Sequence, residues 1–145
     1  MENASWDIDG ARTGTISSFL QPLAHAIPMV ATQDIGRAAA ELLQSTWTGL
    51  RVVELEGPRR YSAADVGVAF SQALHRDVRV EAVPREQWET IFRQQGAHNP
   101  LPRMRMLDGF NEGWIDFEGA RAEHRKGVTT LEEVVSRLLS TPEPT

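Results

Sequence analysis

The feature that most constrains this chain is the alternation of strand-like and helix-like segments from residue 27 onward. Residues 27–43, IPMVATQDIGRAAAELL, begin as an apolar strand and continue directly as a helix. Thr32 is expected to cap this helix, and Asp34 stands in its first turn, where the helix dipole stabilises a carboxylate. The predicted apolar face of the helix consists of Ile35, Ala38, Ala39, Leu42 and Leu43. A strand that turns straight into a helix indicates an α/β fold.

The alternation continues through the middle of the chain. Residues 50–55, LRVVEL, predict a second strand, and the helix that follows has Ser62 and Asp65 at the spacing of a capping box. Residues 77–84, DVRVEAVP, alternate apolar and charged side chains, as a half-exposed strand does. A proline then opens a further helix over residues 85–96, which ends at a glycine.

The last third of the chain predicts two more helices. Apolar residues recur every three or four positions, as on one face of a helix. They are Met104, Leu107, Phe110, Trp114 and Phe117. Gly109 and Gly113 lie within that pattern and predict close packing or a break near one of them. Thr130 and Glu133 form a second capping box before an apolar stripe over residues 131–139. In all, the sequence predicts about three short strands, at least one parallel pair, and four or five helices.

Length bounds the domain organisation. A chain of 145 residues is the size of one domain with a real core. We expect an irregular N-terminal segment over residues 1–26, a single α/β domain over 27–140 and a frayed tail over 141–145.

Composition excludes several classes of function and location. No apolar run approaches the roughly 20 residues that span a membrane, and the acidic start does not resemble a secretory signal. Because there is no cysteine, disulfides and thiolate metal sites are excluded, and we expect a cytoplasmic protein. A net charge of −5 argues against nucleic-acid binding, although the clusters PRMRM (102–106) and AEHRKG (122–127) could meet an anion.

No motif commits the chain to a reaction. The sequence contains no G-x-G-x-x-G or P-loop, no H-E-x-x-H and no G-x-S-x-G. Its four histidines lie far apart, and Tyr61 has no lysine four residues on, as a catalytic tyrosine of a short-chain dehydrogenase would. We therefore predict no catalytic residue and no metal site.

Two groups of residues remain candidates for a binding site. Asp34 could line a pocket at the carboxyl end of a strand, or simply interact with its helix dipole. Four aromatic residues could form either an apolar cleft wall or core, and they are Trp88, Phe110, Trp114 and Phe117.

Three stretches resemble the C-terminal half of the NmrA-like family, atypical short-chain dehydrogenase relatives that bind NAD(P)H. They are IPMVATQDIGRAAAELL, GLRVVELEGPRRYSAADVGVAFSQALHRDVRVEAVPREQW and GFNEGWIDFEG. The resemblance covers nearly the whole chain and is most specific over residues 27–88. It implies a Rossmann-like fold in which an N-terminal half, absent here, carries the glycine-rich cofactor loop.

The resemblance also implies what this chain lacks. Residues 1–3, Met-Glu-Asn, resemble an internal stretch of the family, so the chain resembles a fragment or a shortened product that begins near the start of the substrate lobe. We expect no cofactor on this chain alone, although the family implies NAD(P)H. Because a strand edge and a helix face would lose their neighbours, we expect a homodimer or higher oligomer.

The leading functional hypothesis is the substrate-side lobe of an NmrA-like NAD(P)H-dependent oxidoreductase or redox sensor, without independent catalysis. The predicted substrate-binding residues are Asn3, Asp34, Phe110 and Trp114. Asn3 and Asp34 would orient a polar group, and the two aromatic side chains would hold an apolar small molecule. The alternatives are a self-associating interaction module and an independent small-molecule-binding module.

Overall fold

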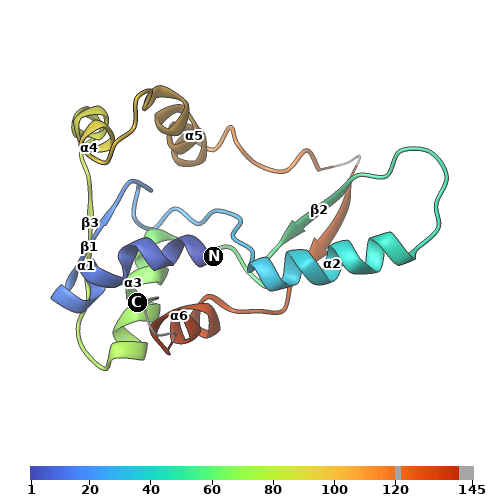
Figure 1. Ribbon diagram of the computed structural model, residues 1–145, viewed down its shortest axis with the longest axis horizontal. Helices are drawn as coiled ribbons and strands as arrows, with labels where there is room; N and C mark the ends of the chain where they lie inside the picture. The colour runs from blue at the N-terminus through green and yellow to red at the C-terminus, as the bar shows by residue number, and fades with distance from the viewer. Residues whose placement is uncertain (120–121, 141–145) are drawn as a thin grey trace.

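The computed structural model describes residues 1–119 and 122–140, and the expected frayed tail lies outside them. Figure 1 shows the arrangement of the elements. In chain order they are η1 (Glu2–Asp7), α1 (Ile8–Thr13), β1 (Thr15–Ser18), α2 (Thr32–Gln44), β2 (Val53–Glu56), α3 (Ala63–Leu74), β3 (Arg79–Ala82), η2 (Arg85–Gln87), α4 (Trp88–Gln94), α5 (Leu101–Glu112), β4 (Glu123–Lys126) and α6 (Leu131–Ser140). The described residues thus contain four strands and six α-helices, slightly more than the sequence predicted.

The four strands form two separate parallel pairs. β1 pairs with β3, with Ser18 opposite Ala82, and β2 pairs with β4, with Glu56 opposite Lys126. The two pairs lie at opposite ends of the molecule (Figure 1). Parallel strands cannot be joined by a tight hairpin, and the chain between each pair contains helices. The predicted α/β fold with parallel pairing is confirmed.

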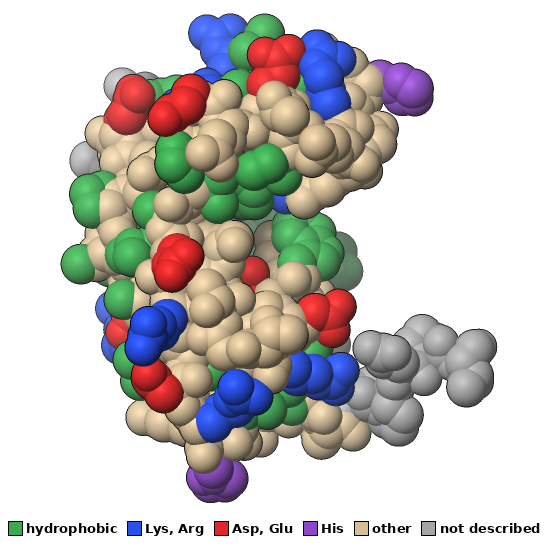
Figure 2. All heavy atoms as spheres, turned by 90° about the vertical axis from the view of Figure 1, so that its left-hand side faces the viewer, with side chains coloured by type: hydrophobic (Ala, Val, Ile, Leu, Met, Phe, Trp, Pro, Cys, Tyr) green, Lys and Arg blue, Asp and Glu red, His purple; other side chains and the backbone are tan. Residues whose placement is uncertain are grey.

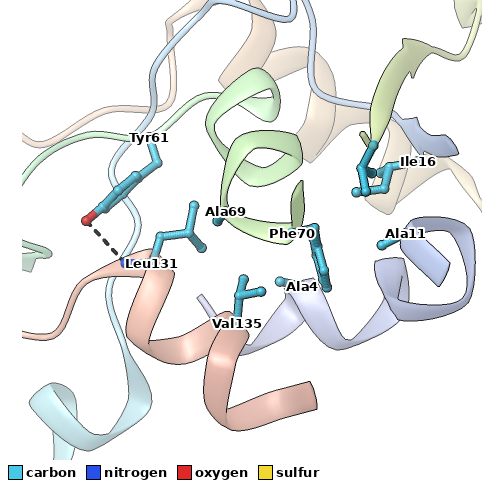
Figure 3. Close-up of a cluster of buried hydrophobic side chains, with 9 residues drawn as sticks. Ala4, Ala11, Ile16, Tyr61, Ala69, Phe70, Leu131 and Val135 are labelled. Atoms are coloured by element: carbon cyan, nitrogen blue, oxygen red, sulfur yellow. Dashed lines mark hydrogen bonds between the residues drawn. The ribbon is translucent and has the colours of Figure 1, made fainter. Parts of the chain in front are cut away.

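The larger core lies where α3 and α6 pack on the N-terminal helices. Its fully buried centre is Phe70, which is surrounded by small and branched side chains (Figure 3). The buried residues around it are Ala4, Ala11, Ile16, Tyr61, Ala69, Val78, Leu131 and Val135. The Tyr61 hydroxyl accepts a hydrogen bond of 3.2 Å from the backbone N–H of Leu131, the first residue of α6. Tyr61 is therefore a structural residue of this core.

A smaller core joins α4 and α5. Trp88 and Phe92 are fully buried in it together with Val83 and Met104. The indole N–H of Trp88 donates to the carbonyl of Val83 at 2.8 Å, and the Phe19 ring meets Trp88 edge-on at 5.7 Å. The sequence left open whether Trp88 lines a cleft or belongs to the core, and the structure places it in the core.

Both predicted capping boxes are present. The Ser62 hydroxyl accepts from the Asp65 N–H at 3.2 Å, and the Asp65 carboxylate accepts from the Ser62 N–H at 2.7 Å. Thr130 and Glu133 make the same reciprocal pair at 3.2 and 2.8 Å. Local sequence alone therefore places the start of α3 and of α6.

The N-terminal part of the chain differs from the prediction. Residues 1–26 were expected to be the least regular, yet they form η1, α1 and β1. Residues 27–31 were expected to be a strand, but they make only a single antiparallel bridge between Ile27 and Tyr61. The next residue is a proline, which has no backbone N–H to continue a ladder.

The capping of α2 was also predicted wrongly. Thr32 is the first residue of the helix rather than its cap, and the preceding Ala31 offers no side-chain hydrogen bond. Instead the Glu2 carboxylate accepts the Thr32 N–H, at 3.0 and 3.1 Å from its two oxygens. A cap supplied from 30 positions away leaves no local signal in the sequence.

The glycines of α5 behave as predicted. The helix ends at Gly113, whose φ of +79° favours a residue without a side chain, so Trp114 and Phe117 lie beyond the helix. A Cβ on Gly109 would meet the side chains of Trp114 and Ile115, so the chain folds back closely on this turn.

The apolar face predicted for α2 is present, but the described part of the chain covers it only in part, since Ala38 and Leu42 are half-buried and the rest is exposed. Ile35 is 46% exposed and Leu43 is 83% exposed. The loop that follows adds Trp47 and Leu50, the latter 93% exposed. We call these four residues the α2 face. An amphipathic helix whose apolar side is open to water is unusual in a complete globular fold.

Candidate functional site

A cleft of about 830 Å³ opens at the carboxyl ends of β1 and β3. Because these strands are parallel, their carboxyl ends share one edge, which is where open α/β sheets bind ligands. Figure 2 shows the surface hollowed between the upper part of the molecule, which carries α4 and α5, and the lower part. We call this hollow the β1–β3 cleft, and its most informative lining residues are Trp6, Asp7, Phe19, Glu81, Ile91 and Arg103.

The cleft is built from seven elements, η1, α1, β1, β3, η2, α4 and α5. Trp6 and Asp7 come from η1, Phe19 directly follows β1, Ile91 belongs to α4 and Arg103 belongs to α5. The floor depends on a close approach of α1 to β1, since a Cβ on Gly10 would lie only 2.6 Å from the Thr15 carbonyl oxygen. A glycine is therefore required at that point for the two elements to pack as they do.

Arg103 supplies a positive charge to the cleft. Its guanidinium carbon lies 4.2 Å from the centroid of the Phe92 ring and 5.5 and 5.8 Å from those of Trp6 and Phe19. Its Nη1 donates to the side-chain carbonyl of Gln95 at 3.3 Å. Within the described residues, no carboxylate lies within ion-pair distance of it. The rings thus hold a guanidinium whose charge remains available to a ligand.

Asp7 supplies a carboxyl group that is a weaker acid than usual. Burial disfavours its ionised form and raises its pKa to about 6. No hydrogen bond or ion pair reaches this carboxyl from the part of the chain that the structure describes. Near neutral pH it can therefore either donate or accept a hydrogen bond, which is a common property of groups at binding and catalytic sites.

The predicted site residue Asp34 lies elsewhere. It is buried, and its carboxylate accepts hydrogen bonds from the N–H groups of Val128 and Thr129, at 3.0 and 2.8 Å. The Thr129 hydroxyl donates to it at 3.0 Å, and Arg37 approaches at 3.7 Å. Both oxygens thus have partners within the protein. This arrangement ties α2 to the segment before α6 and leaves Asp34 outside the β1–β3 cleft.

The other three predicted residues are also outside the cleft and come from different places. Asn3 is exposed on η1, and Phe110 is partly buried in α5. Trp114 is 60% exposed and donates its indole N–H to Glu112 at 3.0 Å. None of the four lines the β1–β3 cleft, so the structure does not bring them together as one pocket there.

Sequence reasoning missed most of the cleft residues for an identifiable reason. Trp6 and Asp7 stand in the segment that was expected to be irregular, so no element placed them beside a strand end. Arg103 belongs to the PRMRM cluster, which was noted as a possible contact for an anion. That basic cluster was the one sequence feature that indicated a residue of the cleft.

The carboxyl ends of the second strand pair are occupied by ion pairs. Glu56 is buried and lies 3.4 Å from His124 and 3.5 Å from Arg60. Arg60 also binds both oxygens of Asp116, at 2.7 and 2.9 Å, and these hydrogen bonds hold the pKa of Asp116 below its usual value. The described residues contain no cluster of three or more metal-ligating side chains. This end of the fold is thus filled with protein charges, whereas the β1–β3 cleft is open.

At three helices, α2, α3 and α6, the N-terminus does not offer a phosphate site to a nicotinamide cofactor. Such cofactors place their pyrophosphate on free backbone N–H groups at a helix start. At α2 the Glu2 carboxylate accepts the first of these N–H groups, and at α3 and α6 carboxylates complete the capping boxes. A carboxylate at each of these positions would repel a phosphate. These three N-termini therefore do not fit the pyrophosphate of NAD(P)H.

No helix in the described residues is long and apolar enough to cross a membrane.

Comparison with known proteins gives a structural match without a sequence match. No family model and no curated protein matches the sequence. Two solved structures of Citrobacter sp. triphenylmethane reductase superpose with TM-scores of 0.73 and 0.71, each at 14% identity, and the second is a complex with NADP(H). They cover 94% and 92% of this chain but only 48% and 47% of the reductase. The chain therefore has an α/β fold that matches about half of a Rossmann-like reductase.

Proposed function

We propose that this chain is the substrate-side lobe of an NmrA-like, NAD(P)H-dependent oxidoreductase or redox sensor of the cytoplasm, without catalysis of its own. In this proposal the β1–β3 cleft holds the substrate, and the nicotinamide cofactor is held by a complementary nucleotide-binding half. The superposition of 94% of the chain on half of a reductase supports this arrangement. The carboxylates at the N-termini of α2, α3 and α6 agree with a cofactor site on the other half.

The observation that carries the proposal is the uncovered α2 face. Leu43 and Leu50 are 83% and 93% exposed, at the end of an otherwise regular amphipathic helix and in its following loop. Covering such a face releases ordered water and stabilises the assembly, by about 25 cal/mol for each Å² of apolar surface. A second half of the same fold would supply that cover.

The size and lining of the cleft indicate the class of substrate. Its volume of about 830 Å³ is within the usual range for small-molecule sites. Trp6, Phe19 and Ile91 supply apolar surface, and two of them supply aromatic rings. A flat, ring-containing substrate fits this lining. The structurally similar Citrobacter enzyme is described as acting on triphenylmethane dyes.

Two titrations test the proposal. We expect a neutral aromatic compound such as 2-naphthalenesulfonamide to bind the chain and quench its tryptophan fluorescence, and we expect Trp6→Ala to weaken this binding. Trp6 is 72% exposed, so its removal leaves the core intact. A calorimetric titration with NADPH and with NADH should show no binding up to millimolar cofactor. Micromolar cofactor binding would contradict a lobe without its own cofactor site, and failure of aromatic binding would contradict the substrate cleft.

The α2 face also favours a second candidate, a self-associating interaction module. A second copy could cover the same apolar surface, and a symmetric dimer would bury it twice. Light scattering decides between them. A dimer that Leu43→Glu and Leu50→Glu convert to a monomer would support self-association, since both side chains are exposed and contribute little to the monomer core. A monodisperse monomer at high concentration would count against it.

A further inference from the structure

We propose that the β1–β3 cleft selects a flat aromatic anion, whose rings lie against Trp6 and Phe19 and whose charged oxygens bind the guanidinium of Arg103. This inference rests on the proposed role of the cleft as a substrate site and adds the charge of the ligand.

The first step of the argument is that Arg103 differs from its neighbours. Arg85 is bound to Asp108 through two hydrogen bonds of 2.6 and 2.7 Å, and Arg93 is bound to Glu89 at 2.8 Å. Among the residues that the structure describes, Arg103 makes one hydrogen bond, to the neutral amide of Gln95. A guanidinium has five N–H donors in a planar fork that matches a carboxylate or sulfonate. Arg103 therefore retains donors and charge for an external anion.

The second step is that Arg103 is held in place before any ligand binds. Three aromatic rings lie within 5.8 Å of its guanidinium, and the nearest, Phe92, is fully buried. Arg103 itself is partly buried, so water screens its charge less than it screens a surface charge. A ligand then binds to a cation that loses little conformational freedom, beside rings that accept a flat apolar body.

The third step concerns the charges that oppose an anion. The other charged side chains lining the cleft are Asp7 of η1 and Glu81 of β3. Gln87 of η2 and Gln95, which directly follows α4, are neutral. Glu81 is exposed, so solvent screens it. Asp7 loses its charge as it is protonated near pH 6. We therefore expect an anionic ligand to bind more tightly at about pH 5.5 than at about pH 8.

The test compares two probes that share one ring system. 2-Naphthalenesulfonate is an anion at every pH used, and 2-naphthalenesulfonamide is its neutral counterpart. We expect the sulfonate to bind the wild-type chain roughly tenfold more tightly than the amide, because hydrogen bonds to charged groups are the stronger ones. The expected preference disappears in Arg103→Gln and is partly kept in Arg103→Lys, which retains the charge but not the fork. Circular dichroism checks that each variant is folded.

A matched control lies two positions further along α5. Arg105 is exposed and does not line the cleft, so Arg105→Gln should leave the preference for the sulfonate unchanged. Equal affinity for the two probes, or a preference that survives in Arg103→Gln, would overturn this inference while leaving the cleft as an aromatic site. Binding of neither probe would overturn the substrate cleft as well. Tighter binding of the cation 2-naphthylmethylammonium would also overturn it and would assign the charge selection to Asp7 and Glu81.

Discussion

The carboxylate of Asp34 is bound to both the backbone N–H and the hydroxyl of Thr129, a residue 95 positions further along the chain. This contact fastens α2 to the segment that leads into α6. The α2 face is uncovered, and the other contacts that hold the helix include the Glu2 carboxylate at Thr32 and the hydrogen bond of Gln33 to Thr129. Asp34 is thus a structural link in this fold.

Replacing Asp34 by alanine should strongly destabilise the chain. The buried N–H of Thr129 would lose its partner, as would the nearby N–H of Val128, so we expect the free energy of unfolding to fall by about 2 to 4 kcal/mol. Urea denaturation measures the change. Arg37→Gln is the matched control, since its side chain is mostly exposed and its ion pair with Asp34 is long, at 3.7 Å. A loss below about 1 kcal/mol in Asp34→Ala would contradict this role.

Two glycine substitutions should have opposite effects on stability. A Cβ on Gly127 would collide with the Asp34 carboxylate, so Gly127→Ala should destabilise the chain by about 2 kcal/mol. Gly36 lies inside α2 with open space around it, and Gly36→Ala should stabilise the helix by about 1 kcal/mol. Thermal unfolding of both variants checks the signs. If the two substitutions change the unfolding temperature equally, the close contact between Gly127 and Asp34 does not exclude a side chain.

The elements that sequence predicts correctly are those whose causes are local. The two capping boxes, the stop of α5 at Gly113 and the packed turn at Gly109 all depend on residues a few positions apart. The partners Glu2 and Thr32 are 30 positions apart, and no local pattern connects them. The N-terminal helices likewise pack against α3 and α6, which lie far along the chain. The strand predicted at residues 27–31 failed for a local reason instead, because Pro28 has no backbone N–H for a ladder.

The candidate cleft shows the same division. Its lining comes from seven elements, and only the tertiary fold brings Asp7 of η1 and Arg103 of α5 to one strand edge. The sequence marked Arg103 only as part of a basic cluster. The sequence could not decide the role of Asp34. The helix dipole stabilises a carboxylate in the first turn whether or not that carboxylate also has a distant partner.

Arg85 and Asp108 should show measurable coupling. Their side chains form a two-pronged ion pair that joins η2 to α5, and the Arg85 hydrogen bonds lower the pKa of Asp108. In a double-mutant cycle with Arg85→Gln and Asp108→Asn we expect a coupling of about 1 kcal/mol near pH 7, since both groups are partly exposed. A group with a lowered folded pKa stabilises the protein above its unfolded pKa. The coupling should therefore fade as the pH falls below about 4.

Asp7 should lower the stability of the chain at neutral pH. Its pKa of about 6 in the folded protein exceeds its ordinary value of 3.8, so the folded state binds a proton that the unfolded state has released between those values. Stability should then fall as the pH rises from about 4 to about 6, and stay lower above that range. Because the cleft admits water, we expect Asp7→Asn to raise the free energy of unfolding by about 1 to 2 kcal/mol near pH 7.5, less than the full shift would imply.

The control for this prediction is Asp9→Asn, on an exposed position one half-turn further along the chain. It should change stability by less than about 0.5 kcal/mol at either pH, as surface substitutions usually do. Urea denaturation of wild type, Asp7→Asn and Asp9→Asn at about pH 4 and about pH 7.5 separates the two positions. If Asp7→Asn has the same effect at both pH values, the carboxyl is not buried as the structure places it. The asparagine amide does not titrate and keeps nearly the same shape as the carboxyl group. A gain in the free energy of unfolding at the higher pH alone therefore follows only if the folded protein raises the pKa of Asp7.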